Sequence, residues 1–526
     1  MNEAALLQQI KELKQQISKK DMQIIKLEEQ VKLLQYLHFG TKSERLTGED
    51  ERTGLLFNEA EDTAFEQNDQ QQIEKTKKTI EIGPQTRTVN EKVGRTPIDQ
   101  SIPREEKLYD LTDEEKICDC GHELKCIGEY VTERLKIKPP EVTVIREIKK
   151  KYVCENCEGV EREDEKGVIT AQGPKHLIPG SMADESFLAW SISEKFEFAL
   201  PFYRQAIRLK QIGAPIPRAT LSNLTVKAGI KCEPIYKLLR PHLLSGPAIN
   251  GDETRVQVMK EPGRKNQSQS WMWVFLGGPP GQECIVYQYE ETRSHDIPYE
   301  FLGGYAGLFQ SDDYEGYHTA IRKLKNETGS EILHFLCWAH ARRYFHRYWE
   351  STKKQDKEAK TILDLISALF ELEDLRDQYS TKGFLKQRKN KAELIFAELK
   401  QKLETLLRQT PSGLSFGKAI AYTLDNWEQL VAYVDHYELT PANNAAERAI
   451  RPFVIGRKNW LFSGSPAGAK SSAILYSLVE SAKLHNLKPF EYLHYIFRQI
   501  PYCLNDDDYA ALLHFNVTPE QLQAAR

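Results

Sequence analysis

Three acidic residues that are far apart in the chain could together hold divalent metal ions. Asp252 lies in an alternating segment, Asp312 follows a short apolar segment, and Glu447 lies in a segment with helical character. Three carboxylates meeting at one point repel one another unless cations share them, and oxygen ligands of this kind prefer Mg²⁺. Two such ions, about 4 Å apart, can activate a water and stabilise the leaving 3′ oxygen in a phosphoryl transfer.

Taken singly, each of these acids is weak evidence for such a site. An aspartate at a strand end is more often a turn residue, and a glutamate on a helix usually faces solvent. Whether the three carboxylates come close together therefore depends on how the strands and helices that carry them are arranged.

The segments around the acids predict a mixed five-stranded sheet. Alternating apolar residues predict three antiparallel strands, and two later strands are each preceded by a short helix. The predicted strands are 250–259, 270–275, 284–287, 308–311 and 332–336, and the helices are 294–302 and 317–325. This succession is that of an RNase H-like fold, in which the fourth strand lies beside the first.

That arrangement would bring two of the acids together and leave the third to a later helix. Asp252 lies on the first strand and Asp312 at the end of the fourth. Thr440 can cap the helix that carries Glu447, Pro441 suits its first position, and Pro452 is expected to end it.

Length and composition bound the class of protein. A chain of 526 residues is too long for one compact domain, and 72 basic against 76 acidic residues give a net charge of −4. A uniformly basic chain is excluded, but local basic patches can still bind nucleic acid. We find no apolar run of about 18 residues, no signal peptide and no disulfide framework, so we expect a reduced, cytoplasmic protein without membrane spans.

The first 46 residues follow the spacing of a coiled coil, with only Lys20 out of register. Apolar residues alternate at intervals of four and three, namely Leu6, Ile10, Leu13, Ile17, Ile24, Leu27, Val31 and Leu34. This seam predicts self-association as a homodimer or higher oligomer. The alternative is a single amphipathic helix packed on its own protein. Residues 47–107 are polar and aperiodic, and we expect a disordered linker there.

A cysteine cluster in residues 108–165 predicts a small zinc-binding β unit. The four expected zinc ligands are Cys118, Cys120, Cys154 and Cys157. The first pair is C-x-C rather than C-x2-C, so Cys126 or His122 could replace one thiolate. The alternative is a set of reduced cysteines without metal. Flanking segments 141–146 and 151–153 are expected strands.

Residues 166–245 predict a helical DNA-binding module. Between Pro201 and Arg240 there are eight basic residues and one acidic residue, a local charge of +7. Expected helices at 202–211 and 218–224 flank a Gly-Ala-Pro turn, which is a helix-turn-helix outline. We expect phosphate contacts from Arg204, Arg208 and Arg218. The alternative is a solvated helical hairpin.

Two further groups lie beside the expected core motifs. Arg342, Arg343, Arg448 and Arg451 could clamp DNA phosphates, or pair with the protein's own acids. His334, Cys337 and His340 form an H-x2-C-x2-H pattern. One interpretation of that pattern is a metal site. The interpretation we favour is a buried cysteine and a histidine packed on a helix, because free cysteines are usually buried.

At these residues the chain resembles the large DDE subunit of the insertion-sequence sixty-six family of bacterial transposases. The resemblance spans nearly the whole chain, from Phe39-Gly40-Thr41-Lys42-Ser43-Glu44 through the cysteine cluster to the core. Its most specific motifs are Asp252-Glu253-Thr254, Ser311-Asp312-Asp313-Tyr314-Glu315-Gly316-Tyr317, Cys337-Trp338-Ala339-His340-Ala341-Arg342-Arg343 and Asn443-Asn444-Ala445-Ala446-Glu447-Arg448-Ala449-Ile450-Arg451-Pro452. Because the motifs occur in the right order, the resemblance implies a catalytic triad of Asp252, Asp312 and Glu447.

The resemblance has three further implications. The family has Gly after its second Asp, so Asp312 is the expected ligand and Asp313 a departure. A helical insertion is expected between Asp312 and Glu447, and 353–407 has suitable apolar spacing at Ile362, Leu365, Ile366 and Leu369. The irregular first cysteine pair and the tail at 512–515, which lacks the family's tryptophan, are departures.

We therefore expect a multidomain α+β protein with an RNase H-like core interrupted by an all-α insertion. The expected divisions are coiled coil 1–46, linker 47–107, zinc unit 108–165, helical module 166–245, core 246–350 and 440–495, insertion 351–439, and a C-terminal element 496–526.

The expected function is a nucleoid-associated DDE transposase that binds its element's terminal inverted repeats, cleaves there and joins the ends to target DNA. It would use two Mg²⁺ ions, a structural Zn²⁺ and double-stranded DNA, and the resemblance implies small accessory proteins as further partners. The alternatives are a non-catalytic DNA-binding or assembly protein on the same scaffold, and a nuclease without strand transfer.

Overall fold

The computed structural model describes residues 142–153, 168–411 and 413–524, together with scattered helical positions between Lys14 and Val31. The predicted zinc ligands Cys118, Cys120, Cys154 and Cys157, the linker and most of the predicted coiled coil lie outside the described residues. The chain divides into two units, with one boundary between Arg146 and Glu147. The elements below belong to the unit that takes in residues 147–526.

A short hairpin precedes the main body of this unit. Strand β1 (Lys151–Val153) pairs antiparallel with β2 (Val168–Thr170). The strand expected at 151–153 is therefore confirmed, but that expected at 141–146 is not, since its described residues 142–146 have no regular secondary structure. Val144 and Ile145 there are largely exposed, and alternation alone cannot hold a strand that has no pairing partner.

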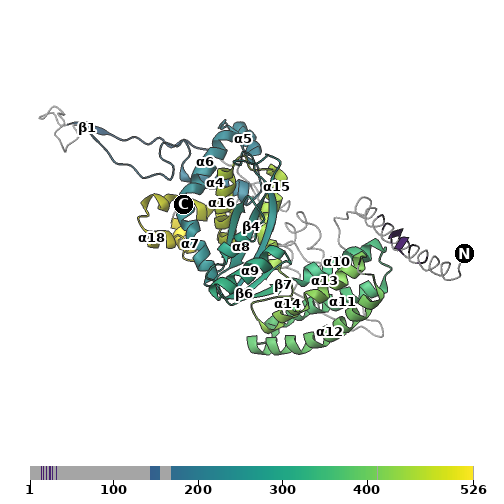
Figure 1. Ribbon diagram of the computed structural model, residues 1–526. Coiled ribbons are helices and arrows are strands. Elements are labelled where there is room, and N and C mark those ends of the chain that lie inside the picture. Colours follow the sequence, from purple (N-terminus) through teal and green to yellow (C-terminus); the bar gives the residue numbers. More distant parts are fainter. Residues whose placement is uncertain are drawn as a thin grey trace, which may run out of the picture. The chain divides into compact units, whose positions relative to one another are not determined.

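Four helices follow, and they contain the predicted helix-turn-helix outline (Figure 1). They are α4 (Glu185–Phe196), α5 (Phe202–Gln211), α6 (Arg218–Lys231) and α7 (Glu233–Leu244). The prediction for α5 has the observed bounds, whereas α6 runs seven residues beyond its predicted end at Leu224. Leu221, Leu224 and Ala228 continue one buried face along α6, which explains the extension.

The centre of the molecule is a mixed sheet with strand order β5-β4-β3-β6-β7. Its strands are β3 (Ala248–Gln257), β4 (Gln269–Gly277), β5 (Cys284–Glu290), β6 (Gly307–Ser311) and β7 (Ile332–Leu336). The first three pair antiparallel, and β6 joins β3 in parallel on the other side. The prediction that the fourth strand lies beside the first is confirmed. Strand β3 begins two residues before its expected start, because Ala248 and Ile249 already pair with β6.

One face of this sheet is covered by α8 (Asp296–Phe301) and α9 (Glu315–Thr328). Phe275 on β4 stacks on Phe301 with ring centroids 3.7 Å apart, and Trp273 meets Tyr317 edge to face. Alternate residues of a strand face opposite sides, so Val274 between them faces the other layer.

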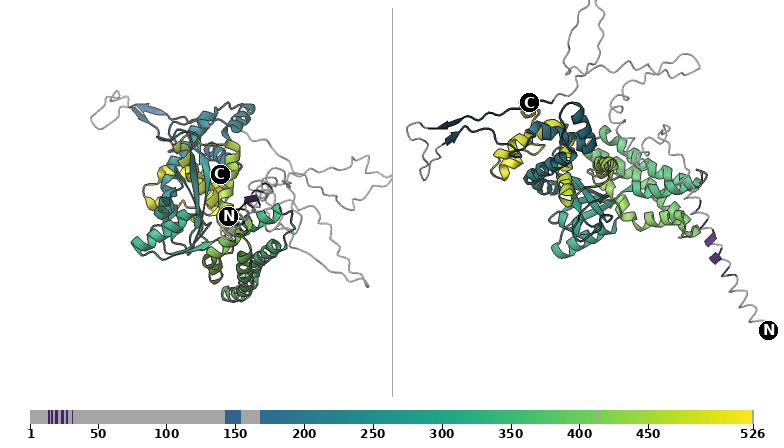
Figure 2. Two further views of the ribbon diagram at one scale, coloured as in Figure 1. Left: turned by 45° about the vertical axis from the view of Figure 1, so that its right-hand side comes forward. Right: turned by 90° about the horizontal axis from the view of Figure 1, so that it is seen from above.

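That other layer consists of α15 (Asn444–Trp460) and α16 (Pro466–Leu484) (Figure 2). Tyr287, the register partner of Val274, contacts Phe453 of α15 and Tyr476 of α16 through its ring. The sheet is thus covered on both faces, and the two helical layers are built from segments far apart in the sequence.

A second hydrophobic core belongs to the helices between β7 and α15. They are α10 (Trp338–Ser351), α11 (Lys357–Glu371), η1 (Leu372–Gln378), α12 (Thr381–Gln409), α13 (Ser415–Asp425), α14 (Trp427–Val431) and η2 (Ala432–Asp435). Three of the four apolar residues singled out there, Ile362, Ile366 and Leu369, are fully buried, and Leu365 packs against the cluster.

Helix α15 differs from its predicted bounds at both ends. It begins at Asn444 with Asn443 as its N-cap residue, and Pro452 lies inside it. Thr440 does not cap it, because its hydroxyl donates a hydrogen bond to the Ala442 carbonyl at 2.7 Å, and Pro441 lies before the helix begins. A proline removes one helical hydrogen bond, but the buried apolar face of α15 continues beyond Pro452 and sustains the helix.

The chain ends with α17 (Pro489–Gln499), η3 (Ile500–Tyr502), α18 (Asp506–Ala510) and α19 (Pro519–Ala524). Leu512 and Leu513 of the tail are buried in the main core. Among the helices described here, none is both long enough and apolar enough to cross a membrane.

Candidate active site

Asp252 lies on β3, and Asp312 directly follows the end of the neighbouring parallel strand β6. Asn250 on β3 is the register partner of Gln310 on β6, and each aspartate lies two residues further along. Residues two apart share a face of the sheet. The two aspartates therefore lie side by side, on the face that α15 covers.

Glu447 reaches this face from the first turn of α15. The turn is held to β3 by Asn443, whose Nδ2 donates to the Gly251 carbonyl at 2.9 Å. The Oδ1 of Asn443 accepts a hydrogen bond from Asn250 Nδ2, also at 2.9 Å. These bonds fix the register between α15 and the strand that carries Asp252.

The three carboxylates influence one another's ionisation. The pKa of Asp252 lies well above its usual range, because of burial and then the charges of Glu253, Asp312 and Glu447. Burial is also the main cause of the raised pKa of Asp312. The pKa of Glu447 is raised by burial against the opposing charges of Arg343 and Arg451, with Asp312 raising it further. The charges of the three predicted acids thus act on one another, but among the described residues their oxygens do not gather within 4.8 Å as a ligand group.

Such a set of carboxylates suits divalent cations. Glu447 Oε1 is buried and has no hydrogen-bond partner among the described residues, and a lone buried carboxylate oxygen is costly. A cation would satisfy that oxygen and offset the mutual repulsion of the three acids. The residues present fit Mg²⁺, which takes carboxylate oxygen ligands.

Asp313 is occupied elsewhere. Its Oδ1 accepts a hydrogen bond from His318 Nε2 at 2.8 Å, and its Oδ2 accepts one from Asn426 Nδ2 at 2.9 Å. Within the described part of the chain, Asp312 has only the Tyr314 backbone N–H as a hydrogen-bond donor, at 3.2 Å. Of these two neighbours, Asp312 is therefore the acid available to a ligand.

An ion pair between the buried Glu253 and the partly exposed Arg293 was not anticipated from the sequence. Glu253 faces the α9 side, where it accepts hydrogen bonds from Arg293 Nε at 2.8 Å and from the Tyr317 hydroxyl at 2.5 Å. Burial raises the pKa of Glu253 to about 7, with Asp312 raising it further and Arg293 opposing the shift. Arg293 Nη2 also lies 3.9 Å from Asp312 Oδ2. The only signal was the position of Glu253 in the Asp252-Glu253-Thr254 motif, and no pattern pointed to Arg293.

The arginines predicted beside the core motifs divide into two groups. Arg343 Nη2 lies 3.9 Å from Glu447 Oε1, and the charges of Arg448 and Arg451 act on the same carboxylate. Arg342, by contrast, is only 5% exposed and contributes to the buried face of α10. That burial makes Arg342 a poor candidate for contact with DNA.

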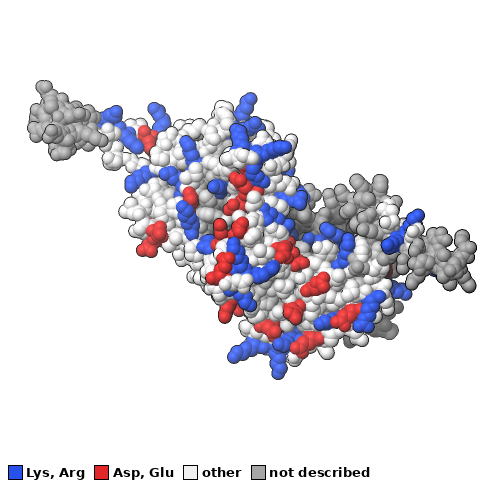
Figure 3. Space-filling model, in the orientation of Figure 1, with Lys and Arg blue, Asp and Glu red and all other residues white. Residues whose placement is uncertain are grey.

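The arginines of the helical module are also not equivalent. Arg204 on α5 and Arg218 at the start of α6 are exposed. Arg208 pairs with Glu194 at 3.2 Å and lies over the Trp190 ring, so it already has partners within the protein. In the view of Figure 3, Lys and Arg side chains lie on the surface over α5 and its neighbouring helices.

The H-x2-C-x2-H pattern is split between the two faces of the sheet. His334 Nε2 hydrogen-bonds to Ser311 Oγ at 2.8 Å, and the His334 ring packs on His318 of α9. Cys337 and His340 lie beyond the strand end, beside Glu447. The three residues of the pattern therefore do not form one metal site.

Comparison with known proteins identifies the family. Residues 180–471 match the Transposase IS66 family, and residues 477–513 match the IS66 C-terminal element. Residues 115–158 match the zinc-finger binding domain of transposase IS66, and residues 26–106 match a segment described as Transposase C of IS166 homeodomain.

Full-length relatives and solved structures are also similar. Uncharacterized protein y4jD of Sinorhizobium fredii (strain NBRC 101917 / NGR234) is 28% identical over 93% of this chain and 94% of its own length. Uncharacterized protein y4qI of the same strain is 27% identical over 94% and 89%. The Mos1 strand transfer complex matches 51% of this chain and 82% of its own chain at 12% identity, with a TM-score of only 0.14. The first family match spans 292 of 526 residues, so this chain belongs to the IS66 family of transposases.

Proposed function

We propose that this chain is an active DDE transposase that cleaves DNA at its element's terminal inverted repeats and transfers the ends to target DNA. The observation that carries the proposal is the grouping of Asp252, Asp312 and Glu447 on one face of the sheet, where their charges act on one another. An RNase H-like core is supported by the strand order, with two parallel strands added beside the first of three antiparallel ones.

In this proposal the three carboxylates hold two Mg²⁺ ions, which supply activation of the attacking water or 3′ hydroxyl and stabilisation of the leaving oxygen. The protein residues position these acids. Asn443 holds the first turn of α15 on β3, and Arg293 pairs with Glu253 behind Asp312. Arg343, Arg448 and Arg451 supply positive charge beside Glu447, where a phosphate backbone would lie.

DNA binding is divided between modules. Arg204 and Arg218 on the helical module would contact phosphates. The zinc-finger segment would bind structural Zn²⁺ through Cys118, Cys120, Cys154 and Cys157, as the match of residues 115–158 supports. We further propose self-association through residues 1–46, action at the nucleoid, and work with small accessory proteins.

The test uses purified full-length protein and a DNA fragment that ends in the element's terminal repeat. Asp252→Asn, Asp312→Asn and Glu447→Gln should each abolish Mg²⁺-dependent strand cleavage while binding of the fragment is retained. The control Asp364→Asn, an exposed acid on α11, should cleave like the wild type. Cleavage that survives in the three variants would contradict the assignment.

Two assays separate the competing functions. Repeat-specific binding without cleavage by the wild type at any Mg²⁺ concentration would favour the non-catalytic DNA-binding protein. Supplying pre-cleaved ends tests strand transfer, because a simple nuclease would cleave the first substrate and yield no joined product from the second.

A further inference from the structure

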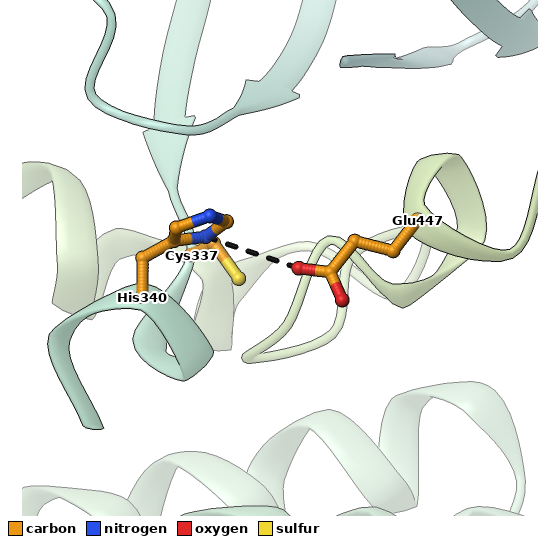
Figure 4. A group of neighbouring side chains, drawn as sticks. All are labelled: Cys337, His340 and Glu447. Carbon is orange, nitrogen blue, oxygen red and sulfur yellow. Dashed lines mark ion pairs between the residues drawn. The ribbon is translucent and has the colours of Figure 1, made fainter. Parts of the chain in front are cut away.

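Three side chains with metal-binding atoms gather where α10 and α15 begin (Figure 4). Cys337 is the N-cap residue of α10, His340 lies in the first turn of α10, and Glu447 lies in the first turn of α15. The cysteine sulfur, one imidazole nitrogen and one carboxylate oxygen all lie within 4.8 Å of one another. His340 Nδ1 is 3.9 Å from Glu447 Oε1.

Packing alone leaves two of these atoms unexplained. His340 Nδ1 and Glu447 Oε1 are both buried and have no hydrogen-bond partner among the described residues. A buried polar atom without a partner costs about 1–3 kcal/mol, so two that face each other at 3.9 Å call for a shared ligand. Arg343 Nη2 lies at 3.9 Å from the same oxygen, too far for a hydrogen bond.

The third atom is held in place. Cys337 Sγ accepts a hydrogen bond from the Asn443 backbone N–H at 3.1 Å, and Asn443 directly precedes α15. The sulfur is therefore fixed against the same turn that carries Glu447. His334 cannot contribute, because it is bonded to Ser311 on the opposite face of the sheet.

We propose that Cys337, His340 and Glu447 form a binding site for one thiophilic divalent cation of the zinc type. Sulfur and imidazole ligands select Zn²⁺ over Mg²⁺, and three protein ligands leave the fourth tetrahedral position to water. Bond lengths of about 2.0–2.3 Å require ligand atoms about 3.3–3.6 Å apart, so atoms that now lie within 4.8 Å of one another close by up to about 1.5 Å. The thiol releases its proton to solvent when the ion binds.

The proposed zinc-type site and the catalytic Mg²⁺ site would both use the Glu447 carboxylate. The effect of zinc on cleavage rests on the proposed function, whereas the binding site itself does not. An ion bound to Cys337 and His340 would hold the Glu447 carboxylate that the two aspartates need. Micromolar zinc should then inhibit Mg²⁺-dependent strand cleavage, and the inhibition should be lost when the thiolate is removed.

The direct test is cobalt binding to metal-free, full-length protein. The thiolate-to-cobalt charge-transfer absorption and the bound cobalt are measured for wild type, Cys337→Ser and His340→Gln. Cys232→Ser is the matched control, since Cys232 is also a fully buried free cysteine but lies outside the group. Because the zinc-finger cysteines proposed at 118–157 would also bind cobalt, the readout is the difference between variants.

We expect wild type and Cys232→Ser to bind one more cobalt per chain than either cluster variant. Equal cobalt content and equal absorption in all four proteins would overturn the site. Circular dichroism checks folding, and if Cys337→Ser is unfolded, His340→Gln, which keeps the thiol, decides the outcome.

Measuring how zinc inhibits strand cleavage distinguishes the proposed metal site from the proposed transposase activity. The zinc concentration for half-inhibition of cleavage should rise at least tenfold in Cys337→Ser and remain unchanged in Cys232→Ser. A wild type without cleavage would remove the proposed function but leave the cobalt result standing. Equal zinc sensitivity of the two cysteine variants would remove the link to Glu447.

Discussion

Asp252 and Glu253 are adjacent acids in quite different surroundings. Glu253 is tied to Arg293 and Tyr317 on the α9 side of the sheet. Asp252 faces α15 and has no such cationic partner among the residues that the structure describes, and its pKa is raised by burial and by neighbouring negative charge. The alternation of a strand thus separates an internally neutralised acid from one that needs an external cation.

We predict that Asp252→Asn stabilises the metal-free protein at neutral pH. A raised pKa means that the folded state holds the proton more tightly than the unfolded state. Stability is therefore lost as pH rises from about 4 through the raised folded pKa. Removing the charge should recover roughly 1–3 kcal/mol at pH 7, measured as a higher melting temperature in EDTA.

The same measurement has a built-in control. Adding Mg²⁺ should raise the melting temperature of the wild type, because the ion binds the folded carboxylates, and should raise that of Asp252→Asn much less. An equal Mg²⁺ effect on both proteins would show that the ion binds elsewhere.

A second prediction concerns the neighbours Asp312 and Asp313. Asp312→Asn should abolish strand cleavage, because the loss of a metal ligand costs more than the loss of a residue that only hydrogen-bonds to a ligand, which lowers activity by about 10–100-fold. Asp313→Asn keeps one oxygen for His318 or Asn426. It should lose about 1 kcal/mol of stability and retain cleavage within about tenfold. The reverse ranking in a cleavage time course would exchange their roles.

At the scale of elements, the link between α15 and β3 depends on Asn443. Its side chain bonds to both Asn250 and Gly251 and is 1% exposed. Asn443→Ala should cost about 2–3 kcal/mol of unfolding free energy, because the Gly251 carbonyl loses its side-chain donor and the Asn250 amide loses one of its two acceptors. It should also slow cleavage by moving Glu447 relative to Asp252. Asn444→Ala, at the exposed next position, is the control and should change neither denaturant midpoint nor rate appreciably.

The helical insertion is anchored by one fully buried arginine, Arg388 on α12. Its guanidinium donates to four backbone carbonyls and to Glu373, the carbonyls being those of Tyr433, Val434, His436 and Leu439. These carbonyls belong to the segment that leads into α15. The insertion thereby also fixes the path of the chain toward Glu447.

We predict that Arg388→Met destabilises the protein by about 3–5 kcal/mol, because the buried carbonyls and Glu373 lose their donor. Lys389→Met is the matched control, since Lys389 pairs with Asp435 on the surface, and should cost less than about 1 kcal/mol. Urea unfolding followed by tryptophan fluorescence measures both. Similar midpoints for the two variants would argue against the anchoring role.

At the scale of the whole molecule, the net negative charge of the chain disfavours binding to DNA, which is itself negatively charged. The chain carries a charge of −4, so binding must come from local basic surfaces. Arg204→Ala with Arg218→Ala should weaken binding of all DNA sequences. The slope of log affinity against log salt should fall by about 1.8, at about 0.9 per lost phosphate contact. Lys360→Ala with Lys382→Ala, on the insertion, removes the same charge and should leave the slope unchanged in a titration by fluorescence anisotropy.

Much of this architecture can be predicted from local patterns. Periodicity alone located the five strands and the helix α5, because side-chain alternation and amphipathic spacing are local consequences of burial. The order of the motifs indicated the family, which the match of residues 180–471 confirms. Local cues failed where tertiary contacts override them, as at Pro452 inside α15 and at the unpaired segment 142–146.

The sequence by itself therefore determined the five core strands, their order along the chain and the family, because each of these depends on patterns among neighbouring residues. Only the tertiary structure decided which side chains meet. It engaged Asp313 with His318, joined Glu253 to Arg293, and separated His334 from Cys337 and His340. The physical reason is that such meetings depend on strand register and on which face a residue occupies, and a shift of one position reverses the face.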